Sequence, residues 1–291
     1  MTTRFKLAAA LALSTAFTAA PALAQEMSSP DQSFDRASHF DGVYVSGTVG
    51  LAAQNNDRGD QLFFDNNRNG TYNDVLPNPA GANAFSPGYC SGTSTANNPA
   101  AGCRGDRDKM EFAARIGVDG RFMGGNGVAG GLIEVSGNHS TDGTSGFSTT
   151  PAGYSLTRRL DYAISARGRF GYTPNGGALF YVTGGPSYAR INHGFTTTNT
   201  ANSFTQNNDD KMVFGGQVGG GAAVMFTDHV SLGLEYLFNS YRDRKYFVGV
   251  GAGTANPLTN PFLINGGGTN IQPSDTKFEF HSLRATISYQ F

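Results

Sequence analysis

Eight stretches of the chain alternate apolar and polar residues with a period of two, which is the spacing of side chains along a β-strand. The clearest stretch covers residues 109–122, where Phe112, Ile116 and Val118 share one face and charged residues share the other. Glycine is abundant, at 40 of 291 residues, and helix-forming residues are sparse, so an all-β fold is predicted. The predicted strands cover residues 42–54, 109–122, 128–138, 159–172, 178–192, 212–226, 230–241 and 277–291.

The connections between these strands belong to two classes that alternate along the chain. Long polar segments follow every second strand, and short turns rich in Gly and Asn follow the others. This asymmetry is typical of an antiparallel up-and-down transmembrane β-barrel, with long extracellular loops and short periplasmic turns. A soluble β-sandwich is the alternative, but it has no reason to place every long loop at one end. An eight-stranded barrel is therefore predicted for residues 41–291, with long loops at 55–108, 139–157, 193–211 and 242–276.

Hydropathy and charge agree with a barrel. The mean hydropathy is −0.31, which suits a barrel because only alternate residues of each strand meet lipid. No apolar run reaches about 18 residues, so no membrane-spanning helix is predicted. The net charge of −1 gives no electrostatic basis for binding nucleic acid.

The N-terminus has the pattern of a secretory signal peptide. Arg4 and Lys6 precede an apolar run over 7–20, and the small residues of Ala22-Leu23-Ala24 form a cleavage site. We expect a cleaved signal over 1–24, export through the Sec pathway, and a periplasmic tail or short plug over 25–40. An uncleaved N-terminal anchor is the alternative.

Two cysteines, Cys90 and Cys103, lie close together in the sequence of a chain that we expect to be exported. A disulfide is the default expectation in an oxidising compartment, and a pair of free thiols is the alternative.

The predicted lumen-facing sides of the strands carry many charges. Five acids and six arginines would fill an interior that, with eight strands, is just wide enough for its side chains. Isolated charges there would be costly, so paired and hydrogen-bonded networks are expected. We interpret them as an electrostatic plug, with a narrow or gated ion path as the alternative. The predicted network comprises Glu111, Arg115, Asp119, Arg121, Glu134, Arg159, Asp161, Arg167, Arg169, Glu235 and Arg284.

The first long loop contains a candidate calcium site, which is the one cofactor considered for this chain. Oxygen-bearing side chains recur at alternate positions and a glycine follows, as at the start of an EF-hand loop. Leu76 stands where the bidentate Glu is expected, so any affinity should be weak. A plain Asn/Gly turn is the alternative. The candidate ligands are Asp65, Asn67, Asn69, Thr71 and Asp74.

Catalysis has little support in the sequence. The five histidines show no metal-binding spacing, and no acid is placed to complete a triad with His139-Ser140 or His281-Ser282. We therefore predict that the protein is not an enzyme.

Several motifs together resemble a known family. The signal peptide, the entry strand Asp41–Val45, the segment Tyr181–Gly185 and the ending Ser288–Phe291 are similar to small outer-membrane β-barrel proteins of proteobacteria, the OmpA/OmpX-like "porin family" group. The resemblance implies the outer membrane of a Gram-negative bacterium, with membrane lipid and lipopolysaccharide as partners. It also implies assembly by periplasmic chaperones and the barrel-assembly machinery, for which Phe291 would be the signal.

Three functions follow from these observations as expectations. The first is a structural outer-membrane barrel with surface-exposed loops and a plugged lumen. The second is a narrow, porin-like pore for small solutes or ions. The third is a barrel enzyme that modifies lipid A.

Overall fold

The computed structural model describes residues 39–54 and 59–291. The predicted signal peptide and most of the predicted periplasmic segment lie outside the described residues. Within the described ranges, no helix is long and apolar enough to cross a membrane.

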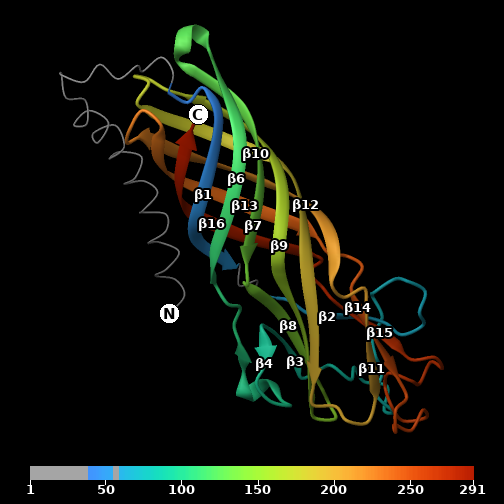
Figure 1. Ribbon diagram of the computed structural model, residues 1–291. Helices are drawn as coiled ribbons and strands as arrows, with labels where there is room; N and C mark the ends of the chain where they lie inside the picture. The colour runs from blue at the N-terminus through green and yellow to red at the C-terminus, as the bar shows by residue number, and fades with distance from the viewer. Residues whose placement is uncertain (1–38, 55–58) are drawn as a thin grey trace.

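Eight antiparallel strands form a closed barrel, which confirms the predicted fold class (Figure 1). The largest sheet has ten strands, and pairing between β9 (Ala152–Tyr172) and β10 (Ala178–Thr197) closes it. Two further strands, β8 (Thr141–Ser148) and β3 (Gly88–Ser91), extend its edge beyond the ring. The first and last barrel strands complete this ring, because they pair with each other from Tyr44–Gln290 to Gln54–Phe280. The barrel strands are β1 (Gly42–Gln54), β6 (Lys109–Phe122), β7 (Gly127–Asn138), β9 (Ala152–Tyr172), β10 (Ala178–Thr197), β12 (Lys211–Met225), β13 (Val230–Arg242) and β16 (Lys277–Gln290).

Most strand limits fall where the sequence predicts them, but β9 and β10 are longer than predicted. Both continue beyond the barrel, and their extensions pair with each other from Leu160–Ile191 to Tyr154–Thr197. At the opposite end of the barrel, short turns join β6 to β7, β9 to β10 and β12 to β13. We call this the turn end; it also holds Phe291, whose amide donates to the carbonyl of Val43.

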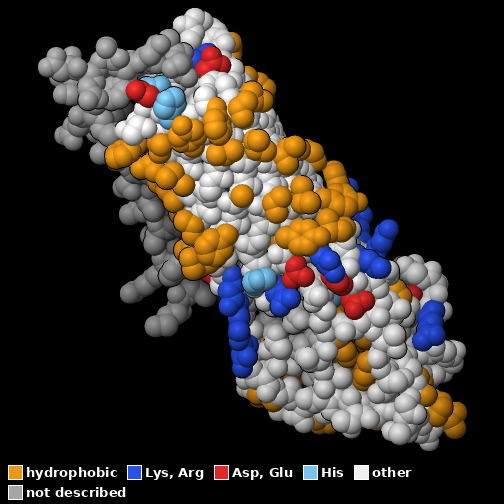
Figure 2. All heavy atoms as spheres, in the orientation of Figure 1, with side chains coloured by type: hydrophobic (Ala, Val, Ile, Leu, Met, Phe, Trp, Pro, Cys, Tyr) orange, Lys and Arg blue, Asp and Glu red, His pale blue; other side chains and the backbone are white. Residues whose placement is uncertain are grey.

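The barrel wall is apolar outside and polar inside. Outward residues such as Val118, Phe214 and Ile287 are more than half exposed, at 54%, 58% and 56%, whereas inward Glu235 and Arg284 are fully buried. Figure 2 shows the hydrophobic side chains gathered over the barrel wall and bounded by charged side chains. The facing of β10, which the sequence left open, is now fixed: Tyr181, Thr183 and Ser187 point inward.

The segments predicted as long polar loops fold into a second region, which we call the cap (Figure 1). The segments lie at one end of the barrel as predicted, but they are not irregular throughout: they contribute short strands and a hydrophobic core of their own. Phe85 is central to this core, with its ring near those of Phe64, Tyr154 and Phe262. The added strands are β2 (Leu62–Asp65), β3 (Gly88–Ser91), β4 (Thr93–Ser94), β5 (Cys103–Arg104), β8 (Thr141–Ser148), β11 (Ser203–Asn207), β14 (Phe247–Gly251) and β15 (Thr269–Pro273).

Candidate functional site

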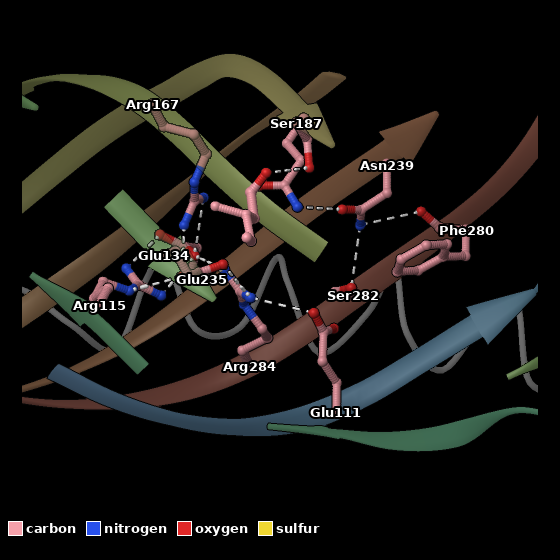
Figure 3. Close-up of polar contacts among 12 residues, drawn as sticks. Glu111, Arg115, Glu134, Arg167, Ser187, Glu235, Asn239, Phe280, Ser282 and Arg284 are labelled. Atoms are coloured by element: carbon pink, nitrogen blue, oxygen red, sulfur yellow. Dashed lines mark hydrogen bonds and ion pairs between the residues drawn. The ribbon is translucent and has the colours of Figure 1, made fainter. Parts of the chain in front are cut away.

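Six charged side chains meet at the centre of the lumen, as Figure 3 shows. Three arginines and three glutamates come from five strands, so the positive and negative charges of the cluster are equal in number. Arg115 lies directly opposite Glu134 in the β6–β7 ladder, and Glu235 lies opposite Arg284 in the β13–β16 ladder. The register therefore creates two neighbouring ion pairs, which the remaining contacts join into one cluster. We call this six-residue cluster the lumen network: Glu111, Arg115, Glu134, Arg167, Glu235 and Arg284.

Glu235 receives arginines from three strands. Its Oε1 accepts from Arg284 Nη2 at 2.5 Å, and the Arg115 guanidinium approaches both carboxylate oxygens at 3.0 and 3.1 Å. Arg167 Nη1 lies 3.3 Å from the same Oε1. These donors come from strands that are not neighbours of one another, so the carboxylate connects opposite walls of the barrel.

Glu134 is the second carboxylate of the network that contacts more than one arginine. It accepts from Arg167 Nη2 at 2.8 Å and from Arg284 Nη1 at 2.9 Å. Arg284 also reaches Glu111, at 3.2 Å. All six side chains are almost completely buried, so each charge depends on its partners in place of water.

Apolar and aromatic layers close the lumen on both sides of the network. Toward the turn end, Arg169 pairs with Asp119 and lies between the rings of Tyr44 and Tyr181, at 4.7 and 5.1 Å from their centroids. Beyond this layer, Phe40 packs into the barrel mouth with residues of three strands. Toward the cap, a buried apolar cluster fills the lumen: Ala52, Leu160, Ala163, Ala189, Ile191, Tyr241, Phe278 and Phe280.

The position of Phe40 bears on the predicted N-terminal plug. Phe40 is 3% exposed, and its amide donates to Gln290 Oε1 at 3.1 Å. The preceding His39 is also buried, and its Nδ1 lies 3.2 Å from the carbonyl oxygen of Gly176. The last two residues of the predicted 25–40 segment therefore close the turn end of the barrel.

The structure corrects the prediction for Arg159 and Asp161, which do not face the lumen. A β-bulge explains the error: Arg190 pairs with Tyr162, Ile191 pairs with Leu160, and Asp161 between them has no partner. The extra residue reverses the facing of everything before it in β9. Arg159 and Asp161 instead form an ion pair with each other at 3.1 Å on the outside. Arg121 has the inward phase of β6 and is partly exposed at the turn end.

A second charged cluster lies where the cap joins the barrel, and no sequence pattern predicted it. Arg158 is buried there and contacts the carboxylates of Asp142 and Asp275 at 2.5 and 2.7 Å. His193 Nε2 lies 2.6 Å from Asp243 Oδ2, and its ring stacks on Tyr246. The surrounding acids hold the pKa of Arg158 above its ordinary value.

Asp106 belongs to the same junction, on the segment that leads from the cap into β6. Its Oδ1 accepts from the amide of Gly143 at 2.9 Å. Burial and the nearby Asp142 carboxylate raise the pKa of Asp106 to about 7. The junction thus contains a carboxyl group that changes charge near neutral pH.

The predicted disulfide is present between Cys90 in β3 and Cys103 in β5. It closes a segment of the cap that contains the short β4–β5 pairing and a single turn of 3-10 helix at Pro99–Ala101. This segment packs on β8 through the β3–β8 ladder.

The candidate calcium ligands form a turn whose oxygens accept hydrogen bonds from the backbone. The Asp65 carboxylate accepts from the amides of Asn69 and Gly70, at 2.9 and 3.0 Å. Asp74 accepts from the amide of Asn66, and Asn69 Oδ1 accepts from the amide of Thr71. Asn67 Oδ1 accepts from the amide of Asn69. These contacts are those of the Asn/Gly turn alternative, and calcium binding stays a prediction.

The histidines occupy separate environments. His139 and His229 are exposed, and His281 Nδ1 lies 2.6 Å from the Tyr236 hydroxyl on the outside of the wall. His193 has an acid partner, but its Nδ1 has no hydrogen-bond partner among the residues that the structure describes. A nucleophile on that nitrogen is what a triad would need.

Comparisons with known proteins give low similarity throughout. No protein-family model matches the sequence, and no match was found among curated proteins. The outer membrane protein OprG from Pseudomonas aeruginosa is similar in structure, with a TM-score of 0.46 at 9% identity over 88% of this chain and 99% of that chain. Neisserial surface protein A (NspA) has a TM-score of 0.36 at 11% identity, over 86% and 98%. Ail, the attachment invasion locus protein of Yersinia pestis, has 0.33 at 9%, over 86% and 99%.

These values are too low to indicate a family or a function. The fold assignment rests on the strand pairing itself, and the resemblance to the OmpA/OmpX-like group stays a prediction.

Proposed function

We propose that this protein is an outer-membrane β-barrel of a Gram-negative bacterium whose barrel anchors the cap on the outer surface. The apolar outer wall supports a membrane location, because more than a dozen large hydrophobic side chains there are exposed and would be unfavourable in water. A closed barrel leaves no unpaired edge, which lipid requires. Aromatic residues at the turn end, including Phe122, Tyr172 and Tyr289, suit a membrane-interface girdle.

The observation that carries the proposal is the filled lumen. Four successive layers, from the apolar cluster under the cap to Phe40 at the turn end, leave the barrel interior occupied by side chains. A barrel filled in this way supports anchoring and display rather than passage of solutes. The cap, in contrast, has its own core and a disulfide, and these favour a folded binding surface over flexible loops.

Planar-bilayer recording tests the proposal directly. The purified full chain, reconstituted beside a porin as positive control, should give no steady open-channel current. Steady unitary currents would favour the second candidate, a narrow pore, and would overturn the plugged-barrel account.

Protease treatment of intact cells tests which side the cap occupies. External protease should cut within the cap and leave a barrel fragment that still migrates anomalously on unheated gels. Cutting only after the outer membrane is permeabilised would place the cap in the periplasm and contradict the proposal.

We also propose that lipopolysaccharide surrounds the barrel and that assembly uses the barrel-assembly machinery and periplasmic chaperones. Phe291 supports this, since it directly follows the closing strand β16 and is 71% exposed at the turn end. Deleting Phe291 should lower the amount of folded protein in the outer membrane, measured by heat-modifiable mobility.

A further inference from the structure

Two cations lie directly opposite each other on the outer wall of the barrel, next to the cap. Arg242 ends β13 and Lys277 begins β16, and they are partners in the ladder between these strands. Both are exposed, and neither forms an ion pair among the residues that the structure describes. Like charges directly opposite in a sheet are destabilising, so an anion bound between these two side chains would stabilise the pair.

The other outward-facing arginines of this rim are neutralised within the chain. Arg159 pairs with Asp161 at 3.1 Å, and Arg190 pairs with Asp210 at 2.5 Å. Two acids lie close to Lys277 in the sequence, and each has another partner: Glu279 Oε1 accepts from the Ser240 hydroxyl at 2.8 Å. Asp275 Oδ1 accepts from the backbone amide of Lys277 at 2.8 Å, and its Oδ2 contacts Arg158 at 2.7 Å. Among the described residues, Arg242 and Lys277 therefore differ from Arg159 and Arg190 in that no carboxylate forms an ion pair with either side chain.

The surface below the pair changes in the order expected for a membrane interface. Leu234 and Ala285 lie opposite each other within the apolar wall. Nearer the cap, Phe238 and His281 lie opposite each other and form an aromatic row. Arg242 and Lys277 lie four residues further along each strand, about 10 Å above the aromatic row after allowance for strand tilt. That is the depth of lipid headgroups rather than of the hydrocarbon core.

We infer that Arg242 and Lys277 together bind a phosphate group of an outer-leaflet glycolipid whose acyl chains lie along β13 and β16. The inference rests on the proposed function for its placement in the outer leaflet. Arginine supplies a planar fork of donors and lysine a mobile point charge, which together suit a phosphate. The neighbouring apolar and aromatic rows provide the surface for the acyl chains.

Native mass spectrometry of the full chain in detergent, titrated with diphosphorylated lipid A, tests the inference. The double variant R242Q/K277Q should bind lipid A about thirtyfold more weakly, as expected for the loss of two cations at an anionic lipid surface. The matched control K109Q/K211Q removes the same charge from exposed rim lysines that lie opposite Ala52 and Ile191, and it should bind like the wild type. Lipid A stripped of phosphate should bind wild type and R242Q/K277Q equally.

Thermal unfolding gives a second readout that a merely structural role would not produce. Without lipid A, R242Q/K277Q should unfold at the same or a slightly higher temperature than the wild type, because a repulsive pair is gone. With lipid A, the order should reverse. Equal lipid A binding by R242Q/K277Q and the wild type would overturn the inference, and so would wild-type binding that is unchanged when lipid A is stripped of its phosphate groups.

Binding in detergent does not depend on membrane orientation or on conductance. A failure of the phosphate site is therefore distinguishable from a failure of the proposed function, which the bilayer and protease experiments test.

Discussion

The barrel and the cap arrange the same residue types in opposite ways. In the barrel, charged side chains point inward and apolar side chains face outward, as between Glu235 and Leu234. In the cap, apolar side chains such as Phe85 form the interior. The strand β9 belongs to both regions, and the bulge at Asp161 marks the change: Ile164 is exposed on one side of it, and Tyr154 is buried on the other.

The difference shows that alternation of apolar and polar residues predicts a β-strand but does not predict which of its two faces is buried. The surroundings of each region decide that, because lipid takes the apolar face of the barrel and water takes the polar face of the cap. Different mutations should therefore destabilise the two regions: removal of buried charges should destabilise the barrel, and removal of apolar core side chains should destabilise the cap.

The largest effect is expected from Glu235→Gln in the lumen network. The change leaves the guanidinium groups of Arg115, Arg167 and Arg284 with one fewer buried carboxylate, which should lower the free energy of unfolding by about 3–5 kcal/mol. Urea denaturation followed by heat-modifiable gel mobility measures it. The control Asp161→Asn breaks the exposed pair with Arg159 and should cost less than about 1 kcal/mol. Equal effects of the two variants would show that the lumen network contributes no special stability.

The next effect should appear only in the cap. Phe85→Ala removes a side chain that is 1% exposed and should destabilise the cap by about 3 kcal/mol. Limited proteolysis should then cut the cap faster, while the barrel keeps its heat-modifiable mobility. Leu258→Ala, at a side chain that is 85% exposed, is the control and should leave cutting unchanged. Loss of barrel mobility in Phe85→Ala would mean that the two regions do not unfold separately.

Removing the disulfide should have a smaller effect, again confined to the cap. Cys90 and Cys103 are 13 residues apart, and opening a loop of this size costs about 2 kcal/mol. The variant with both cysteines changed to serine should be cut faster between β3 and β5 than the wild type. Reduction of the wild type with dithiothreitol should reproduce this cutting pattern, and a difference between the two treatments would point to an effect of the serines themselves.

The sequence predicted the barrel well because its strands alternate strongly and its turns contain Gly and Asn. It also indicated the members of the lumen network, because residues such as Arg115 and Glu235 lie on the polar faces of regular strands. It could not reveal the bulge at Asp161, since a bulge adds one residue without any compositional mark. The core of the cap was missed because Phe64, Phe85 and their neighbours are scattered through Gly- and Asn-rich sequence.

The junction cluster was missed for a related reason. Arg158, His193 and Asp243 lie on three different strands or loops, and only the extension of β9 and β10 beyond the barrel brings them together. No local spacing in the sequence predicts that these three residues lie together, so the cluster can be identified only once the register of the long strands is known.

The smallest predicted effect concerns pH at this junction. Burial and Asp142 raise the pKa of Asp106 from 3.8 to about 7, so between these pH values the folded cap binds a proton that the unfolded chain releases. Stability from this group is therefore complete below about pH 4, falls as the pH rises through 7, and is constant above that. Because the carboxyl is partly exposed, we expect a loss of about 1 kcal/mol rather than the full value of the pKa difference.

Pulse proteolysis of the cap in urea at pH 5 and pH 8 measures this loss. Asp106→Asn keeps a neutral acceptor for the Gly143 amide and should remove most of the pH dependence, whereas Glu279→Gln, on the outer wall, should retain it. The barrel midpoint should not follow the Asp106 titration, because the lumen network is separated from the junction by the apolar layer that includes Leu160 and Phe280. A barrel midpoint that moves with the cap across this pH range would instead mean that the junction transmits its charge state into the wall.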